Sequence, residues 1–127
     1  MRMNTKNILV SFQAIVIALL LVVTVSATEL ADPSNVIIKV DGIEVSDNVA
    51  VIAGETVDVK VYFTSEQNAP DVRIKASIEG DKLDVSGVTS SFDVEDGKRY
   101  SKTLTLKVPY ELTDVLSDDL SLSVKIW

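Results

Sequence analysis

Apolar and polar residues alternate along much of the chain. Within Thr56–Phe63 the odd-numbered positions from Val57 are apolar, whereas Asp58 and Lys60 are charged. A period of two puts the apolar residues on one face of a β-strand, and a helix would not segregate them. Three further segments show the same alternation, with apolar positions at Val72, Ile74, Ala76 and Ile78, at Leu104, Leu106 and Val108, and at Leu120, Leu122, Val124 and Ile126. We predict four half-buried strands with these residues facing one core.

Shorter apolar stretches predict additional strands. They cover residues 35–40, 43–45, 49–52 and 83–85, with 91–94 as a further candidate. Asp41-Gly42 and Asp96-Gly97 tolerate the positive φ of tight hairpins, and Gly54, Gly80 and Gly87 mark other turns. Residues 111–116 alone have helical spacing, and they are too few for a crossover between parallel strands. The expected fold is all-β, with strands in an antiparallel sandwich of two sheets.

The first 27 residues show a different pattern. Arg2 and Lys6 precede a nearly continuous apolar run from Ile8 to Val25, and small residues occupy Ser26 and Ala27. This is typical of a secretory leader that is cleaved after Ala27. The alternative is an uncleaved membrane anchor, because 18 residues approach the roughly 20 that span a bilayer. The polar residues within the run favour cleavage.

Both interpretations of the leader place the rest of the chain outside the cell. They predict one helix over residues 7–25 that does not pack into the sandwich, since its apolar surface encircles it. The expected organisation is a signal peptide or membrane anchor over 1–27, a linker over 28–34 and a β-sandwich over 35–127. The membrane is a partner only if the N-terminal helix remains uncleaved.

The amino-acid composition excludes several classes of function. The chain has 12 basic and 19 acidic residues, and it has no Cys and no His. A thiol nucleophile, an imidazole base and a Cys/His zinc site are therefore excluded. The net charge of -7 disfavours nucleic acid as a partner, because phosphate binding needs clustered Lys and Arg. We expect no enzyme activity, no catalytic residues and no cofactor.

Three groups of side chains are candidates for binding or chemistry. The first group consists of acidic side chains in turns, which could hold calcium: Asp41, Glu44 and Asp47, then Asp93, Glu95 and Asp96, then Asp114, Asp118 and Asp119. None of these sets matches a spaced calcium loop, so we expect solvated acids and no metal site. Ser101 and Lys102 resemble a nucleophile pair, yet neighbours in a strand point to opposite faces. Tyr62, Tyr100 and Trp127 are expected to point outward and could stack on sugars, whereas Tyr110 is expected to make a structural corner.

Several motifs resemble the immunoglobulin-like (CARDB-like) modules of archaeal cell-surface and S-layer-type proteins. They are Val51-Ile52-Ala53-Gly54-Glu55-Thr56-Val57-Asp58-Val59, Asn68-Ala69-Pro70-Asp71-Val72-Arg73-Ile74, Phe92-Asp93-Val94-Glu95-Asp96-Gly97-Lys98 and Leu106-Lys107-Val108-Pro109-Tyr110-Glu111-Leu112. The resemblance covers about residues 35–127, and the chain departs from antibody domains in lacking the Cys pair and the core Trp. It implies an immunoglobulin-like sandwich, acting without catalysis as a structural spacer or adhesion unit. Its expected partners are other cell-surface domains or its own continuation. A calcium- or glycan-binding module is the alternative.

The last predicted strand reaches Trp127, and no strand in our count is left to pair beside it. We therefore expect the sandwich to lack its final strand. The resulting edge is a possible interaction site, formed by Leu120, Leu122, Val124, Ile126 and Trp127. An unpaired edge is a template for another strand. One interpretation is that the chain continues in a longer protein. The other is a filament subunit whose neighbour donates a strand, from Asp32 to Val40.

The leader interpretation predicts the N-terminus of the exported protein. Cleavage after Ala27 gives a protein that begins at Thr28, and N-terminal sequencing of the exported fraction measures this directly. An intact N-terminus recovered from the membrane fraction contradicts cleavage and supports an anchor.

The alternation predicts which residues stabilise the core. Val59, Ile74, Leu106 and Val124 lie near the middle of inward faces, so truncation of each to Ala should cost on the order of 2 to 4 kcal/mol of unfolding free energy. Asp58, Arg73, Lys107 and Lys125 should be exposed. Denaturant unfolding of the variants measures the cost, and exposed-site variants serve as controls.

Overall fold

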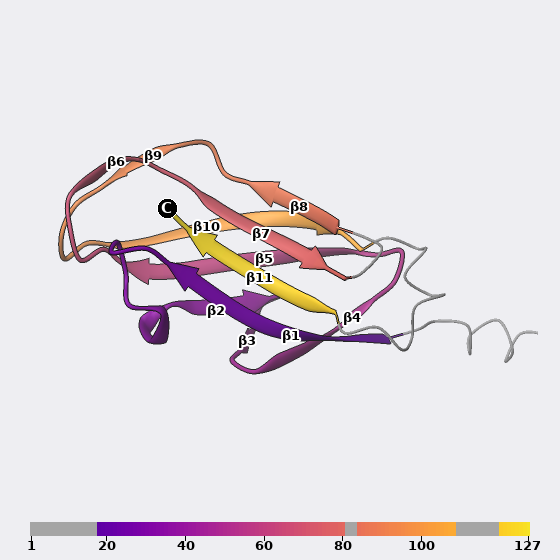
Figure 1. The fold of residues 1–127 in the computed structure, drawn as a ribbon. Coiled ribbons are helices and arrows are strands. Elements are labelled where there is room, and N and C mark those ends of the chain that lie inside the picture. Colours follow the sequence, from indigo (N-terminus) through magenta and orange to yellow (C-terminus); the bar gives the residue numbers. More distant parts are fainter. Residues whose placement is uncertain (1–17, 81–83, 109–119) are drawn as a thin grey trace, which may run out of the picture.

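Eleven strands form three sheets within the part of the chain that the computed structural model describes, residues 18–80, 84–108 and 120–127 (Figure 1). Sheet A runs in the order β4 (Asn48–Ile52), β1 (Ala18–Ala27), β11 (Ser121–Ile126), β7 (Ile74–Glu79) and β8 (Asp84–Val88). Sheet B runs β10 (Arg99–Lys107), β5 (Thr56–Thr64), β2 (Ile37–Val40) and β3 (Ile43–Val45). A small sheet pairs β6 (Ala69–Val72) with β9 (Phe92–Val94), and a 3₁₀ turn spans Pro33–Asn35.

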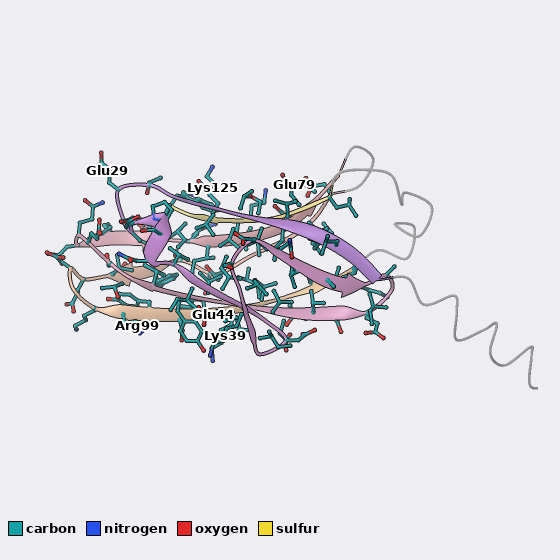
Figure 2. The ribbon with its side chains drawn as sticks, turned by 90° about the horizontal axis from the view of Figure 1, so that it is seen from below. Glu29, Lys39, Glu44, Glu79, Arg99 and Lys125 are labelled. Atoms are coloured by element: carbon teal, nitrogen blue, oxygen red, sulfur yellow. The ribbon has the colours of Figure 1, made fainter. Side chains whose placement is uncertain are left out.

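The inner faces of sheets A and B share one hydrophobic core. Val59, Ile74 and Val124 are 0% exposed and Leu106 is 2% exposed, as the alternation predicts. The polar residues between them point outward, because Asp58, Arg73, Lys107 and Lys125 are exposed. The side chains in Figure 2 accordingly fill the space between the two ribbon layers. The all-β fold and the inward parity of the four main strands are confirmed.

Two glycine predictions have different outcomes. Asp41 and Gly42 both have positive φ, 50° and 85°, and join Val40 to its partner Ile43 in the hairpin that the sequence predicts. Gly87 is not a turn residue. It lies inside β8, where a Cβ would come within 3.2 Å of a Leu106 methyl group. Its missing side chain therefore lets β8 approach sheet B closely.

The expected N-terminal helix is wrong from Ala18 onward. Residues 18–27 form β1 in the middle of sheet A, with β4 antiparallel on one side and β11 parallel on the other. Leu21 is fully buried, whereas Leu20 is 64% exposed and Val22 is 56% exposed. The apolar run thus supplies an alternating strand, and the rest of the expected helix, residues 7–17, lies outside the described residues. In the described ranges, no helix is long and apolar enough to span a membrane.

The final strand does not have an open edge. β11 pairs with β1 from Val22↔Ser121 to Ala27↔Ile126 and with β7 from Ser121↔Glu79 to Ile126↔Ile74. The prediction of a missing final strand was wrong, because the strand count omitted residues 18–27. The β1–β11 ladder is also parallel, so the sheets are not wholly antiparallel as expected.

Other segments differ in detail from the prediction. The expected linker, 28–34, packs against the core through Leu30 and Ala31, each 4% exposed. The strand predicted over Val72–Ile78 is divided at Arg73, whose N–H and carbonyl bond the Trp127 backbone, with N···O distances of 2.7 and 3.0 Å. This division moves the chain from the small sheet into sheet A. The expected helical segment, 111–116, lies outside the described residues.

The position of β1 generates a matched pair of substitutions. Leu21→Ala should lower the unfolding free energy of the full-length chain by about 2 to 5 kcal/mol, because it empties a buried site. Leu20→Ala should change it by less than about 0.5 kcal/mol, because that side chain faces solvent. Urea unfolding of both variants provides the measurement. Equal effects at the two positions would show that β1 does not occupy the sheet.

Candidate functional site

Three cationic side chains gather around one tyrosine on the outer face of sheet B. The charged groups of Lys60, Lys39 and Arg99 lie 5.3, 5.4 and 5.7 Å from the centre of the Tyr62 ring. Figure 2 shows Lys39 and Arg99 on one side of the molecule, opposite Lys125 and Glu79. We call these four residues, Lys39, Lys60, Tyr62 and Arg99, the Tyr62 cluster.

Three members of the Tyr62 cluster, Lys39, Lys60 and Tyr62, line a hollow of about 430 Å³. Its lining is polar and aromatic, and consists of Lys39, Asp41, Gly42, Asp58, Lys60, Tyr62 and Thr103. The hollow therefore offers cations, carboxylates, a hydroxyl group and an aromatic ring to one ligand.

Strand register places the members of the cluster. Lys60 and Tyr62 share the outward parity of β5, while Lys39 lies directly opposite Lys60 on β2. On the other side of β5, Thr103 of β10 is the partner of Lys60. The Asp41–Gly42 hairpin closes the hollow at one end, and the Asp58 N–H donates to a carboxylate oxygen of Asp41 at 2.9 Å.

An aromatic anchor lies next to Arg99 on β10. The Tyr100 ring lies 5.7 Å from Phe63 and 6.0 Å from Phe92, measured between ring centres. Its phenolic oxygen accepts a hydrogen bond from the Glu95 N–H at 2.8 Å. Since Tyr100 points inward and is fixed at both ends, its neighbour Arg99 must point outward, toward Tyr62.

The charges of the cluster are not neutralised by a salt bridge. Across the described ranges, the salt bridge that forms is between Lys98 and Glu95. Lys39 faces Glu44 on β3 and Lys60 on β5 without such a pair. Like charges directly opposite one another in a ladder are destabilising. The Lys39–Lys60 pair is thus locally unfavourable, and Glu44, Asp41 and Asp58 lie near it without forming a salt bridge among the described residues.

Two exposed groups outside the cluster have shifted pKa values. Hydrogen bonds from the backbone and hydroxyl groups of Ser34 lower the pKa of Asp32, which begins the 3₁₀ turn. Hydrogen bonding to Glu95 and its negative charge raise the pKa of Lys98. Both shifts stabilise charged side chains in turns, and neither group lines the hollow.

The structure separates the three aromatics expected on the surface. Tyr62 points outward as predicted, but Tyr100 has the inward parity of β10 and packs against Phe63 and Phe92. Trp127 comes directly after β11 of the other large sheet, is 39% exposed and lies 5.5 Å from the Lys125 ammonium. The expectation of outward-pointing Tyr100 was wrong, and the three rings do not form one platform. Tyr110 lies outside the described residues.

Two of the candidate turn acids accept hydrogen bonds from backbone N–H groups. Asp93 accepts a hydrogen bond from the Asp71 N–H at 3.2 Å, and Asp41 accepts the bond from Asp58 already described. In the ranges 18–80, 84–108 and 120–127, no three acidic side chains lie close enough together to hold a metal ion. Asp114, Asp118 and Asp119 are not among the described residues.

The remaining sequence candidates also separate. Ser101 is exposed, whereas the Lys102 ammonium lies 4.5 Å from the centre of the Phe92 ring. The proposed edge residues Leu120, Leu122, Val124 and Ile126 are buried in the core. In the full-length chain their strand is thus an interior element of sheet A.

A second hollow of about 270 Å³ lies between β1 and the β2–β3 hairpin. Its aliphatic lining includes Val23 and Val25, which are only half-buried. β3 has three residues, so sheet B covers this part of β1 incompletely. The hollow carries no cluster of charges comparable to that around Tyr62.

Sequence reasoning found only part of the Tyr62 cluster. The i, i+2 spacing of Lys60 and Tyr62 on a half-buried strand places both on the outer face. Lys39 and Arg99 join them through strand pairing over long sequence separations, for which the chain offers no local signal. Comparisons with protein-family models, curated proteins and solved structures give no match for this chain.

Proposed function

We propose that the chain is a non-catalytic, immunoglobulin-like module of the cell surface that acts as a structural spacer. One observation carries the proposal, the parallel pairing of β1 with β11. Because these strands run in the same direction, the chain enters sheet A at one end of the pair and reaches Trp127 at the other (Figure 1). β1 alone extends roughly 30 Å, at about 3.3 Å per residue. Ends at opposite poles suit a unit that holds its two neighbours apart.

The immunoglobulin-like assignment is supported by the packing of two sheets around one core. The outward positions of the main strands are mostly polar, although Leu20 and Val22 of β1 are also exposed. The hairpin at Asp41–Gly42 has the positive φ that the sequence predicts. The motifs in the chain support the cell-surface role, together with the leader pattern over residues 1–27, of which β1 is the last part.

Cleavage after Ala27 would change the proposed role. The Thr28 N–H bonds the carbonyl of Ile126 at 3.2 Å, so a protein beginning at Thr28 has both ends at the same pole. Such a module suits the tip of an assembly and would act in adhesion. N-terminal sequencing therefore distinguishes a spacer from a terminal adhesion unit.

Mechanical unfolding tests the spacer role. Force applied between the start of β1 and the end of β11 pulls the two parallel strands along their length, so the ladder bonds are loaded together in shear. The chain has no native cysteine, and the double variant A18C/W127C supplies unique handles for single-molecule pulling. We expect an unfolding force several-fold above that of an unzipping geometry. Forced unfolding reports the barrier to unfolding directly.

The control pulls on the same fold in another direction. Thr64 and Arg99 are partners at one end of the β5–β10 ladder, so handles in T64C/R99C break that ladder one bond at a time. An A18C/W127C force no higher than that of T64C/R99C would overturn the spacer proposal.

A further inference from the structure

We propose that the hollow beside the Tyr62 cluster binds a carboxylated saccharide of the uronic-acid type. Lys39, Lys60 and Arg99 approach one ring from three strands, and two of them are direct partners in the ladder. Ligand binding would be an activity separate from the spacer role. It can be measured in solution, without mechanical load on the protein.

The cations of the cluster form no salt bridge with the described acids, and this favours an anionic ligand. Lys39 and Lys60 face each other on adjacent strands, an arrangement that lowers stability. Local rules are most often broken at functional sites, where a bound partner compensates the cost. A carboxylate between the two ammonium groups would remove the repulsion and form charge-assisted hydrogen bonds.

The rim of the hollow argues against closely spaced phosphate groups. Asp41 and Asp58 both line it, and the whole chain has a net charge of -7. The Asp58 carboxylate already accepts a hydrogen bond from the Thr105 hydroxyl at 2.8 Å, which holds it in place. Closely spaced phosphates would meet these acids, whereas a uronic-acid chain carries one carboxylate per ring, so that the cations can accept a carboxylate while hydroxyl groups face the acids.

The other lining groups fit the hydroxyl-rich body of a sugar. Asp41 and Asp58 have carboxylate oxygens to accept from sugar hydroxyl groups, and Thr103 can both donate and accept. The Tyr62 ring has a negative face that attracts polarised C–H groups. Cation, acceptor and aromatic surface together match one carboxylate on a ring with several hydroxyl groups.

Titration of the full-length chain with oligogalacturonate tests the proposal. Isothermal calorimetry at low ionic strength should show saturable binding, because exposed charges are weakly screened there. The neutral oligogalactose, which lacks the carboxylates, should bind about tenfold more weakly or not at all. Backbone amide NMR shifts should change around Lys39, Lys60 and Tyr62 and not around Trp127.

Matched variants separate a specific site from general charge attraction. Lys60→Gln should weaken oligogalacturonate binding about tenfold while leaving the melting temperature equal or higher, since it relieves the repulsion with Lys39. Lys107→Gln removes the same charge from the exposed far end of β10 and should leave binding unchanged. Tyr62→Phe should retain most binding, and Tyr62→Leu should lose it.

Three results would overturn the proposal. They are the absence of saturable oligogalacturonate binding, an equal loss in Lys60→Gln and Lys107→Gln, and tighter binding of inorganic polyphosphate than of oligogalacturonate. The A18C/W127C handles lie outside the Tyr62 cluster, and the binding variants leave both handle positions unchanged, so each proposal is tested separately.

Discussion

The parallel ladder between β1 and β11 is the constraint on which sheet A depends. β4 joins the sheet through β1, and β11 needs β1 to cover one of its two edges. Buried backbone groups require partners, so loss of this ladder would leave two rows of N–H and carbonyl groups to pair elsewhere. The ladder also fixes where the chain enters and leaves the domain. Architecture and proposed mechanical role therefore rest on the same set of main-chain hydrogen bonds.

Two sequence predictions conflict with the full-length structure: the cleaved leader and the open edge of the last strand. The β1–β11 ladder connects them. A leader cleaved after Ala27 would remove β1, and this would expose the edge of β11 that the sequence predicts to be open. The ten residues of this central strand lie within the predicted export signal, residues 1–27. Removal of β1 by cleavage would thus leave the edge of β11 able to pair with a strand from another chain.

The sequence by itself determined the all-β class, the inward parity of the main strands and the Asp41–Gly42 hairpin. These features depend on a side-chain period of two and on local turn geometry, and both are written in adjacent residues. It could not determine the state of residues 18–27. A continuous apolar run satisfies a helix surrounded by lipid and a strand buried between neighbours, and only the tertiary pairing with β4 and β11 distinguishes Leu21 from Leu20.

The Tyr62 cluster was likewise determined in part by the sequence and in part only by the tertiary structure. Alternation places Lys60 and Tyr62 on one face, whereas Lys39 and Arg99 reach them only after β2 and β10 pair with β5. Parity likewise predicted an outward Tyr62, but Tyr100 turned inward because it shares the parity of Leu104 and Leu106 and completes the aromatic packing with Phe63. Strand register is a long-range property set by the whole core, and for that reason only the tertiary structure assembles the proposed binding surface.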